Sequence, residues 1–275
     1  MGDTWRARVD AAYGDAVERA YEDGLLDVLD EPGPVRGPDL MLDLLDRVGP
    51  GPGDVLLDVG SRDGRHLVEL HGRYGCRVVG VEPAPGNLER MRRVHGGPPH
   101  PVARAVAEAL PVATGSVDVA WIRDVLVHVD PLAPALAEVA RVLRPGGAAV
   151  VFRVVATPLL EPVEAEELWR LCAVAPASAE GATFDAAVAA AGLVVEHRED
   201  VGSEWREHRE VTGTLRASEQ LLRIARLRRD PERYRAALGR EVADGELGNA
   251  LYGVYQLLGK LTAVLDVLRS PGREM

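Results

Sequence analysis

Short apolar segments alternate with helix-like segments between residues 54 and 156, and this alternation constrains the fold of the 275-residue chain more than any other feature. Strands that are connected by helices form a parallel sheet covered on both faces. The sequence therefore predicts an α/β fold with a doubly wound, mostly parallel sheet. The predicted strands of this part are residues 54–59, 77–82, 102–106, 116–122 and 148–155.

The segments that flank this part are mainly helical. Residues 3–31 place Val9, Tyr13, Val17 and Tyr21 at a spacing of four, which is typical of one helix face. Residues 261–268 fit either a strand or a helix by periodicity alone. Further helices are expected at 161–174, 183–191 and through most of 204–258, with a strand at 193–201.

The formal net charge of −11 lies in the flanks: residues 50–156 carry +1, whereas 1–49 carry −7 and 157–275 carry −5. An acidic chain lacks the clustered positive charge that non-specific nucleic-acid binding needs. The two cysteines indicate neither a disulfide scaffold nor a cysteine zinc site. No apolar run approaches the roughly 20 residues of a membrane span, and the first ten residues lack a secretory-signal layout. We therefore expect a cytoplasmic protein.

The most informative motif is Asp58-Val-Gly-Ser-Arg-Asp-Gly64, between a predicted strand and a predicted helix. Gly60 permits a sharp turn, and Gly64 lets the helix begin close to a ligand. Glu82 ends the next strand, 24 residues after Asp58, where a carboxylate can accept hydrogen bonds from both hydroxyls of a ribose. The combination predicts an adenosine-containing ligand; an unliganded turn is the alternative.

The acidic character of this loop distinguishes between adenosine ligands. A dinucleotide site uses closely spaced glycines and a free helix N-terminus to bind a pyrophosphate. Here Gly60 and Gly64 are four apart, and Asp63 would repel a phosphate. Asp58 can instead hold an amino group, so the loop suits S-adenosylmethionine, whose amine and sulfonium are both cationic.

Six sequence blocks in order resemble a class I S-adenosylmethionine-dependent methyltransferase, of the group that includes ubiquinone/menaquinone-type and small-molecule natural-product enzymes. The blocks are residues 55–60, 79–82, 107–111, 116–118, 124–128 and 143–147. The resemblance implies a Rossmann-like, seven-stranded sheet and the cofactor S-adenosyl-L-methionine, with S-adenosyl-L-homocysteine as product. It also implies an N-terminal helical lid (1–49), a cofactor-binding core (50–202), a helical cap over the acceptor site (203–260), and a final strand and tail (261–275).

The resemblance assigns cofactor roles position by position. The implied set is Asp58, Gly60, Ser61 and Gly64 near the methionine part, Glu82 at the ribose, Pro83, Ala107 and Glu108 at the adenine, and Arg123 at the amine. Arg62 stands where the family commonly has glycine, so it either binds the cofactor carboxylate or is a solvated loop residue. Val106 stands where an acid often contacts the adenine. Tyr13 and Tyr21 would close over the cofactor, with Tyr21 near the reaction, unless they pack as ordinary helix residues.

The acceptor side has weaker candidates. His128 follows the fourth predicted strand and is the best base or acceptor-orienting group, with helix packing as the alternative. His208 opens the cap and is a second catalytic candidate. The candidates for an aromatic acceptor pocket, or alternatively for the cap's own core, are Trp205, Tyr252, Tyr255 and Gln256. No metal-ligand pattern is evident.

We therefore expect a methyltransferase for a small organic acceptor such as a bacterial natural product, with O-, N- and C-methylation all open. One alternative is an S-adenosylmethionine-binding protein of the same fold that acts as a cyclase or another non-methylating catalyst. Another is a module that modifies protein or RNA. We expect a monomer or homodimer without nucleic-acid or membrane partners.

Overall fold

The computed structural model describes residues 22–23, 27, 35–37, 39–97 and 100–272. The chain divides into two units, Met1–Val35 and Arg36–Met275, and the fold below is that of the second. The strands are β1 (Val55–Val59), β2 (Arg77–Val81), β3 (Val102–Ala103), β4 (Val117–Arg123), β5 (Leu143–Ala156), β6 (Val194–Gly202) and β7 (Leu261–Arg269). The helices are α3 (Leu40–Val48), α4 (Arg65–Tyr74), α5 (Pro85–His95), α6 (Leu132–Val142), α7 (Pro162–Cys172), α8 (Gly181–Ala190), α9 (Glu204–Val211), α10 (Ala217–Arg229), α11 (Pro231–Leu238) and α12 (Arg240–Leu257), with short 3-10 helices η2 (Leu126–His128) and η3 (Pro176–Ala179).

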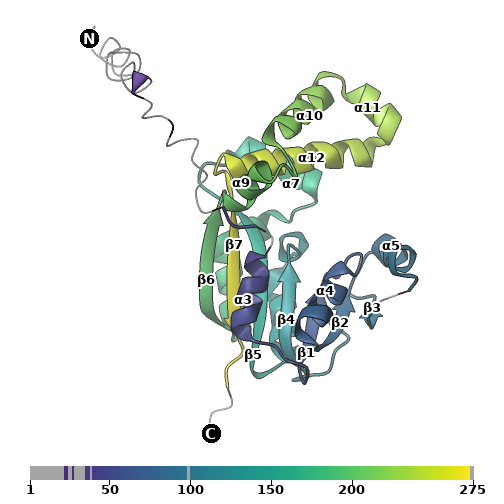
Figure 1. Ribbon diagram of the computed structural model, residues 1–275, viewed down its shortest axis with the longest axis vertical. Coiled ribbons are helices and arrows are strands. Elements are labelled where there is room, and N and C mark those ends of the chain that lie inside the picture. Colours follow the sequence, from purple (N-terminus) through teal and green to yellow (C-terminus); the bar gives the residue numbers. More distant parts are fainter. Residues whose placement is uncertain (1–21, 24–26, 28–34, 38, 98–99, 273–275) are drawn as a thin grey trace. The chain divides into compact units, whose positions relative to one another are not determined.

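The seven strands form one sheet in the order β3-β2-β1-β4-β5-β7-β6. Neighbouring strands from β3 to β5 are parallel, and β7 runs antiparallel to both β5 and β6 (Figure 1). The predicted seven-stranded, mostly parallel sheet is confirmed, and the ambiguous segment at 261–268 is a strand. The third strand is shorter than predicted, because residues 104–106 leave the sheet edge and Ala105 and Val106 instead line a cavity.

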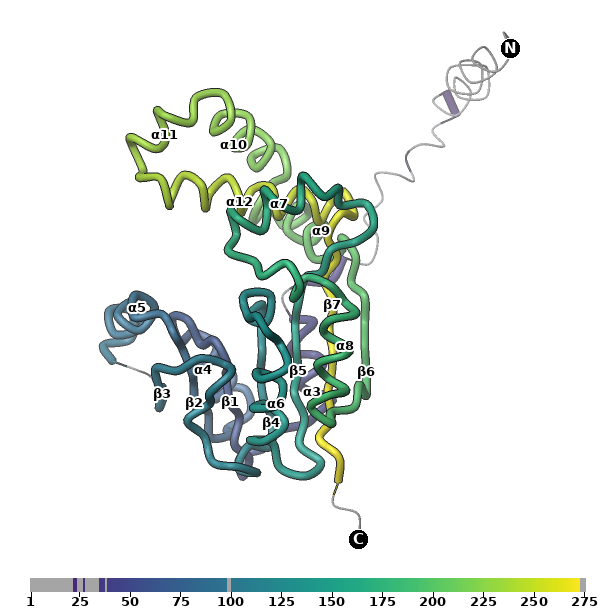
Figure 2. Tube along the Cα trace, turned by 180° about the vertical axis from the view of Figure 1, so that it is seen from behind, coloured from purple at the N-terminus to yellow at the C-terminus, as the bar shows by residue number. Residues whose placement is uncertain are grey.

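Alternating side chains divide the core into two layers, one on each face of the sheet. In β4, Val119 and Trp121 belong to one buried cluster, and Ala120 and Ile122 belong to the other. Helices α3 and α4 cover the first face (Figure 1), and α6 and α8 cover the second (Figure 2). The sheet is therefore buried on both sides, as the apolar strands require.

Helix α3 belongs to this core. Its leucines and Met41 are buried, it packs against β5, and Gly49 ends it in a left-handed conformation with φ of 72°. The sheet domain therefore includes residues 40–48, which the sequence assigned to the lid. Tyr13, Tyr21 and most of the remaining predicted lid lie outside the described residues.

A buried ion pair fixes the last strand. Arg153 of β5 donates from Nε to Asp266 of β7 at 2.8 Å, and Arg198 of β6 donates to the other carboxylate oxygen at 2.5 Å. The Arg153 guanidinium also lies 4.0 Å from the ring centre of Phe184 in α8. Because each buried charge is paired, this network links β5, β6 and β7 without leaving an unpaired charge.

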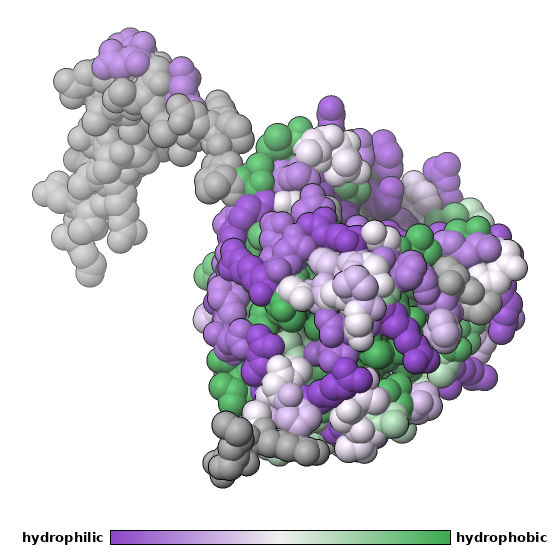
Figure 3. Space-filling view, turned by 60° about the horizontal axis from the view of Figure 1, so that its bottom comes forward, coloured by the Kyte–Doolittle hydropathy of each residue, from purple (hydrophilic) through white to green (hydrophobic). Residues whose placement is uncertain are grey.

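Helices α9 to α12 lie between β6 and β7 in the chain and stand beyond one end of the sheet (Figure 1). Trp205, Leu251 and Tyr255 of these helices join the same buried cluster as the first face of the sheet, and α7 packs against α12. None of the helices in the described part of the chain has the length and apolar character needed to cross a membrane. The face shown in Figure 3 presents hydrophilic and hydrophobic residues side by side.

Candidate functional site

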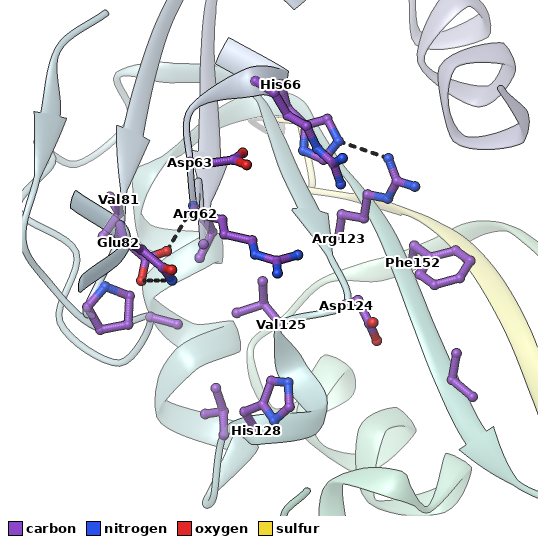
Figure 4. Close-up of a pocket in the computed structure, with 18 of the residues that line it drawn as sticks. Arg62, Asp63, His66, Val81, Glu82, Arg123, Asp124, Val125, His128 and Phe152 are labelled. Carbon is purple, nitrogen blue, oxygen red and sulfur yellow. Dashed lines mark hydrogen bonds between the residues drawn. The ribbon is translucent and has the colours of Figure 1, made fainter. Parts of the chain in front are cut away.

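A cavity of about 590 Å³ opens at the carboxyl ends of β1, β2 and β4, the edge where doubly wound sheets bind ligands. We call its two ends the loop side and the cap side. The loop side is lined by Gly60, Arg62, Asp63, Glu82, Pro83, Asn87, Ala107 and Glu108; the cap side is lined by Phe152, Val154, Trp205, Arg206, Arg209, Tyr252 and Gln256. Between them lie His66, Arg123, Asp124, Val125 and His128 (Figure 4), and Arg65 also lines the cavity.

The turn after β1 requires glycine at position 60. Gly60 has φ of 81°, and a Cβ added there would lie 2.4 Å from Cγ2 of Val125. Its N–H donates to the carbonyl of Val81 at 2.8 Å, which ties the loop to β2. Arg62 also has a positive φ, of 48°, in a region that costs L-residues about 1–2 kcal/mol. Arg62 therefore adopts a left-handed conformation that favours glycine, the residue that the resemblance implies at this position.

Glu82 is held rigidly at the cavity wall. Its carboxylate accepts hydrogen bonds from the Arg62 N–H at 2.9 Å, the Ala84 N–H at 2.8 Å and the Asn87 side-chain amide at 3.0 Å (Figure 4). These donors come from the loop after β1 and the segment after β2, so the carboxylate orientation depends on both turns. The remaining lone pairs can accept from a ligand.

Asp58 lies beneath the turn rather than on the cavity wall, and it is almost completely buried. Burial, reinforced by the nearby Glu82 charge and opposed by Arg123, raises the pKa of Asp58 to about 7. Its Oδ2 and the Oγ of buried Ser61 have no hydrogen-bond partner among the described residues. Buried polar groups are normally partnered, so these two atoms are suited to a donor that a ligand or its bound water supplies.

Arg123 contributes its side chain to the cavity, in addition to the backbone groups that the resemblance implies at the methionine amine. Its Nη1 lies 2.9 Å from Nε2 of His66, and because guanidinium only donates, that imidazole nitrogen is the acceptor. Burial lowers the pKa of His66 to about 4, so the ring is neutral near pH 7. The Arg123 guanidinium also lies 5.4 Å from the ring centre of Trp205.

His128 lies in η2 and faces the cavity (Figure 4). Its Nδ1 is 2.8 Å from the carbonyl oxygen of Ala173, which can only accept, so Nδ1 carries the proton. In the neutral ring Nε2 is then unprotonated and can accept a proton. This tautomer is compatible with the predicted base.

Asp124 is a cavity residue to which the sequence assigned no role. It has φ of 56°, a left-handed conformation uncommon for residues other than glycine. Its side chain lines the cavity and is otherwise surrounded by protein. This burial removes water from the carboxylate and raises the pKa of Asp124, and the nearby His128 and Arg123 oppose the rise. The block 124–128 is visible in the sequence, but the backbone conformation that directs Asp124 into the cavity is not.

On the cap side, three predicted acceptor residues line the cavity: Trp205, Tyr252 and Gln256. The ring of Trp205 lies 5.2 Å from that of Phe152 in β5. Arg206, which the sequence analysis did not single out, donates from Nε to Gln256 Oε1 at 2.8 Å. Arg209 also lines this side without having been predicted.

Several predicted residues lie outside the cavity wall. His208 points from α9 toward Gly37, where an added Cβ would lie 2.5 Å from its Nε2, so it faces away from the site. Tyr255 is buried in the core, with Lys260 Nζ 5.4 Å from its ring centre. Gly64 starts α4 against Met91. No group of three potential metal ligands is found in the described part of the chain.

Comparisons with known proteins find similarity in the central part of the chain. A family model described as a methyltransferase domain matches residues 57–151. An uncharacterized methyltransferase of Mycobacterium ulcerans (strain Agy99) is 38% identical over 99 residues, which are 36% of this chain and 38% of that protein. The chain spans less than two fifths of the length of the first curated relatives it matches.

Solved structures share the fold over most of the chain. The cyclase SpnF has a TM-score of 0.64 and 20% identity, covering 85% of this chain and 81% of that one. The geranyl diphosphate C-methyltransferase from Streptomyces coelicolor A3(2), solved with Mg²⁺, geranyl diphosphate and S-adenosyl-L-homocysteine, has a TM-score of 0.59 and 20% identity, covering 84% and 78%. Residues 57–151 thus match the model of a methyltransferase domain, and the chain as a whole shares its fold with these solved structures.

Proposed function

We propose that this protein binds S-adenosyl-L-methionine on the loop side of the cavity and transfers its methyl group to a small organic acceptor on the cap side. The observation that carries the proposal is the position of Glu82, fixed by three donors at the end of β2 beside the Gly60 turn. The family match and the S-adenosyl-L-homocysteine bound to a protein of the same fold support this choice of cofactor.

The residues of the loop side fit this cofactor. Glu82 accepts from the ribose hydroxyls, and Ala107 and Glu108 lie where the adenine edge would be. The unpartnered Asp58 Oδ2 beneath the turn favours the cationic amine, directly or through water. Close approach depends on Gly60, because any Cβ there would displace Val125.

When bound, S-adenosyl-L-methionine supplies a methyl group activated by its sulfonium. The chain's contribution is to align the nucleophile and exclude water. Trp205, Phe152 and Tyr252 offer an apolar and aromatic surface for the acceptor. His128 Nε2, left unprotonated by the bond to Ala173, can take a proton from an O–H or N–H nucleophile.

The similarity to SpnF favours one alternative, a non-methylating catalyst that retains the cofactor site. The two functions differ in product mass: methyl transfer adds about 14 daltons to the acceptor and produces S-adenosyl-L-homocysteine. A product without that addition, formed while S-adenosyl-L-methionine stays intact, would favour the alternative. We also infer a monomer or homodimer that acts in the cytoplasm, which light scattering and fractionation can test.

The direct test of the cofactor site is Glu82→Ala, measured by isothermal titration calorimetry with S-adenosyl-L-methionine. We expect binding to weaken by ~1–3 kcal/mol through loss of the ribose hydrogen bonds. Glu89→Ala, on the exposed face of α5, is the matched control and should bind normally. Unchanged affinity in Glu82→Ala would remove the ribose assignment, and tight binding of a nicotinamide dinucleotide would contradict the proposal.

A further inference from the structure

Five arginines line the cavity although the chain as a whole is acidic. They are Arg62, Arg65, Arg123, Arg206 and Arg209. None of the five forms a salt bridge with a carboxylate among the described residues. The cavity therefore holds positive charge that the described residues leave unpaired.

Two of these arginines belong to the cap side. Arg206 and Arg209 are three residues apart on α9, so their side chains leave adjacent turns on one helix face. The bond from Arg206 Nε to Gln256 Oε1 fixes the guanidinium and leaves both Nη nitrogens without a partner in the described part of the chain. Burial and the neighbouring Arg209 charge lower the pKa of Arg206, as expected where two cations face one space.

The glutamates of α9 do not neutralise this pair. Glu204 binds Arg36, Glu207 accepts from the Ser203 hydroxyl, and Glu210 accepts from the Ala217 N–H. None of the three lines the cavity. Helix α9 thus presents its cations to the cavity and its anions elsewhere.

The remaining charged groups around the cavity divide by side. Asp63, Glu82 and Glu108 line the loop side, and Asp124 is the one carboxylate next to the cap side in the described lining. Asp124 interacts with Arg123, Arg206 and His128, and its own desolvation disfavours its charge. One such carboxylate does not balance the positive charges of Arg123, Arg206 and Arg209.

We propose, building on the function inferred above, that the acceptor is an anion whose carboxylate or phosphate group is bound by Arg206 and Arg209. Arginine suits this role because its planar guanidinium donates two parallel hydrogen bonds to such groups. The rest of the acceptor lies against Trp205 and Phe152, with its nucleophile directed toward the loop side and His128. The shared requirement is an oxyanion; carboxylates and phosphates are separated by the probes below.

The test titrates benzoate and inorganic pyrophosphate into protein saturated with S-adenosyl-L-homocysteine, with benzamide as the neutral counterpart of benzoate. Calorimetry should show at least one anion binding at least tenfold more tightly than benzamide. Arg206→Gln and Arg209→Gln should each weaken that binding at least tenfold while leaving the affinity for S-adenosyl-L-homocysteine within about twofold. Arg223→Gln, which removes an external ion pair with Glu246, is the matched control and should leave anion binding unchanged.

Three results would overturn the inference: neither anion binds, both variants bind anions normally, or the anions compete with S-adenosyl-L-homocysteine. The third result would assign the arginines to the cofactor carboxylate. Arg209 makes no side-chain hydrogen bond among the described residues, so its substitution remains informative if Arg206→Gln does not fold. If S-adenosyl-L-homocysteine itself does not bind, the proposed function fails, and anion binding that depends on Arg206 and Arg209 would still support the anion site.

Discussion

The loop side and the cap side of the cavity carry opposite charge. Asp63, Glu82 and Glu108 line the loop side, with Asp58 buried behind them, whereas Arg206 and Arg209 line the cap side. A cationic cofactor and an anionic acceptor would each meet a complementary surface, with Arg123 and His128 at the boundary. The formal net charge of the whole chain, −11, therefore does not predict that the two sides differ in charge.

The two sides also differ in how they are built. On the loop side, backbone groups hold the site in place. The Gly60 N–H donates to the carbonyl of Val81, and the N–H groups of Arg62 and Ala84 donate to the carboxylate of Glu82. On the cap side, side chains of α9, α12 and β5 meet only because the cap packs on the sheet. The loop side should therefore be sensitive to backbone changes and the cap side to side-chain changes.

The largest effect on cofactor binding should come from Gly60→Ala, which changes the backbone of the turn on the loop side. The left-handed φ and the 2.4 Å contact with Val125 should together weaken S-adenosyl-L-methionine binding by roughly 2 kcal/mol or more, measured by calorimetry. Benzoate binding on the cap side should change little. Gly72→Ala is the control, because its Cβ meets nothing within 4 Å in α4 and should stabilise the fold by ~0.5–1 kcal/mol. Normal cofactor affinity in Gly60→Ala would show that the turn is not a binding element.

An intermediate effect should appear in the pH dependence of cofactor affinity. Asp58 keeps its proton up to about pH 7 in the free protein, and a bound cation favours its charged form. Cofactor binding below pH 7 should therefore release a proton from Asp58. The affinity for S-adenosyl-L-methionine should rise by up to about tenfold per pH unit as the pH approaches 7, and it should stay constant above pH 7. Without ligand, the raised pKa makes the folded state relatively more stable below about pH 4 and less stable as the pH rises to 7.

Asp58→Asn is the control for this titration. The cofactor's own amine titrates in both proteins, so the difference between the two pH profiles isolates Asp58. In the variant, we expect the affinity for S-adenosyl-L-methionine no longer to rise between pH 5 and 7 through the ionisation of residue 58. If affinity depended on pH in the same way in both proteins, the ionisation of Asp58 would not be coupled to the charge of the cofactor.

The same contrast explains how far the sequence predicts the molecule. The alternation of apolar strands and helices predicts the sheet, and the Gly60 turn with Glu82 predicts the loop side, because both depend on neighbours in the chain. His208 and Arg209 lie on one short helix, yet the first faces Gly37 and the second faces the cavity. That choice depends on how α9 packs against the sheet and α12, which local sequence does not encode.

Asp124 shows the same limit at the boundary of the two sides. The sequence places it after β4, but its left-handed conformation, which directs the side chain, arises from the turn into η2. The sequence leaves Tyr255 open between an acceptor-pocket residue and a residue of the cap's own core, and the structure buries it in the core.

The smallest effect should come from Arg62→Gly, which introduces the residue that the resemblance implies at this position. Removing the left-handed strain should raise the free energy of unfolding by about 1 kcal/mol in urea titrations. The exposed Arg62 side chain should contribute no more than ~1 kcal/mol to cofactor binding. Arg65→Gly, in the first turn of α4, should instead destabilise the fold, since glycine costs about 1 kcal/mol in a helix.

A crystal structure of the complex with S-adenosyl-L-homocysteine tests the assignment of the two sides most directly. We expect the ribose hydroxyls on Glu82, the sulfur facing His128 and the cap side, and Arg206 and Arg209 free of contact with the cofactor. A homocysteine carboxylate bound by Arg206 and Arg209, or an adenosine seated against Trp205, would contradict it.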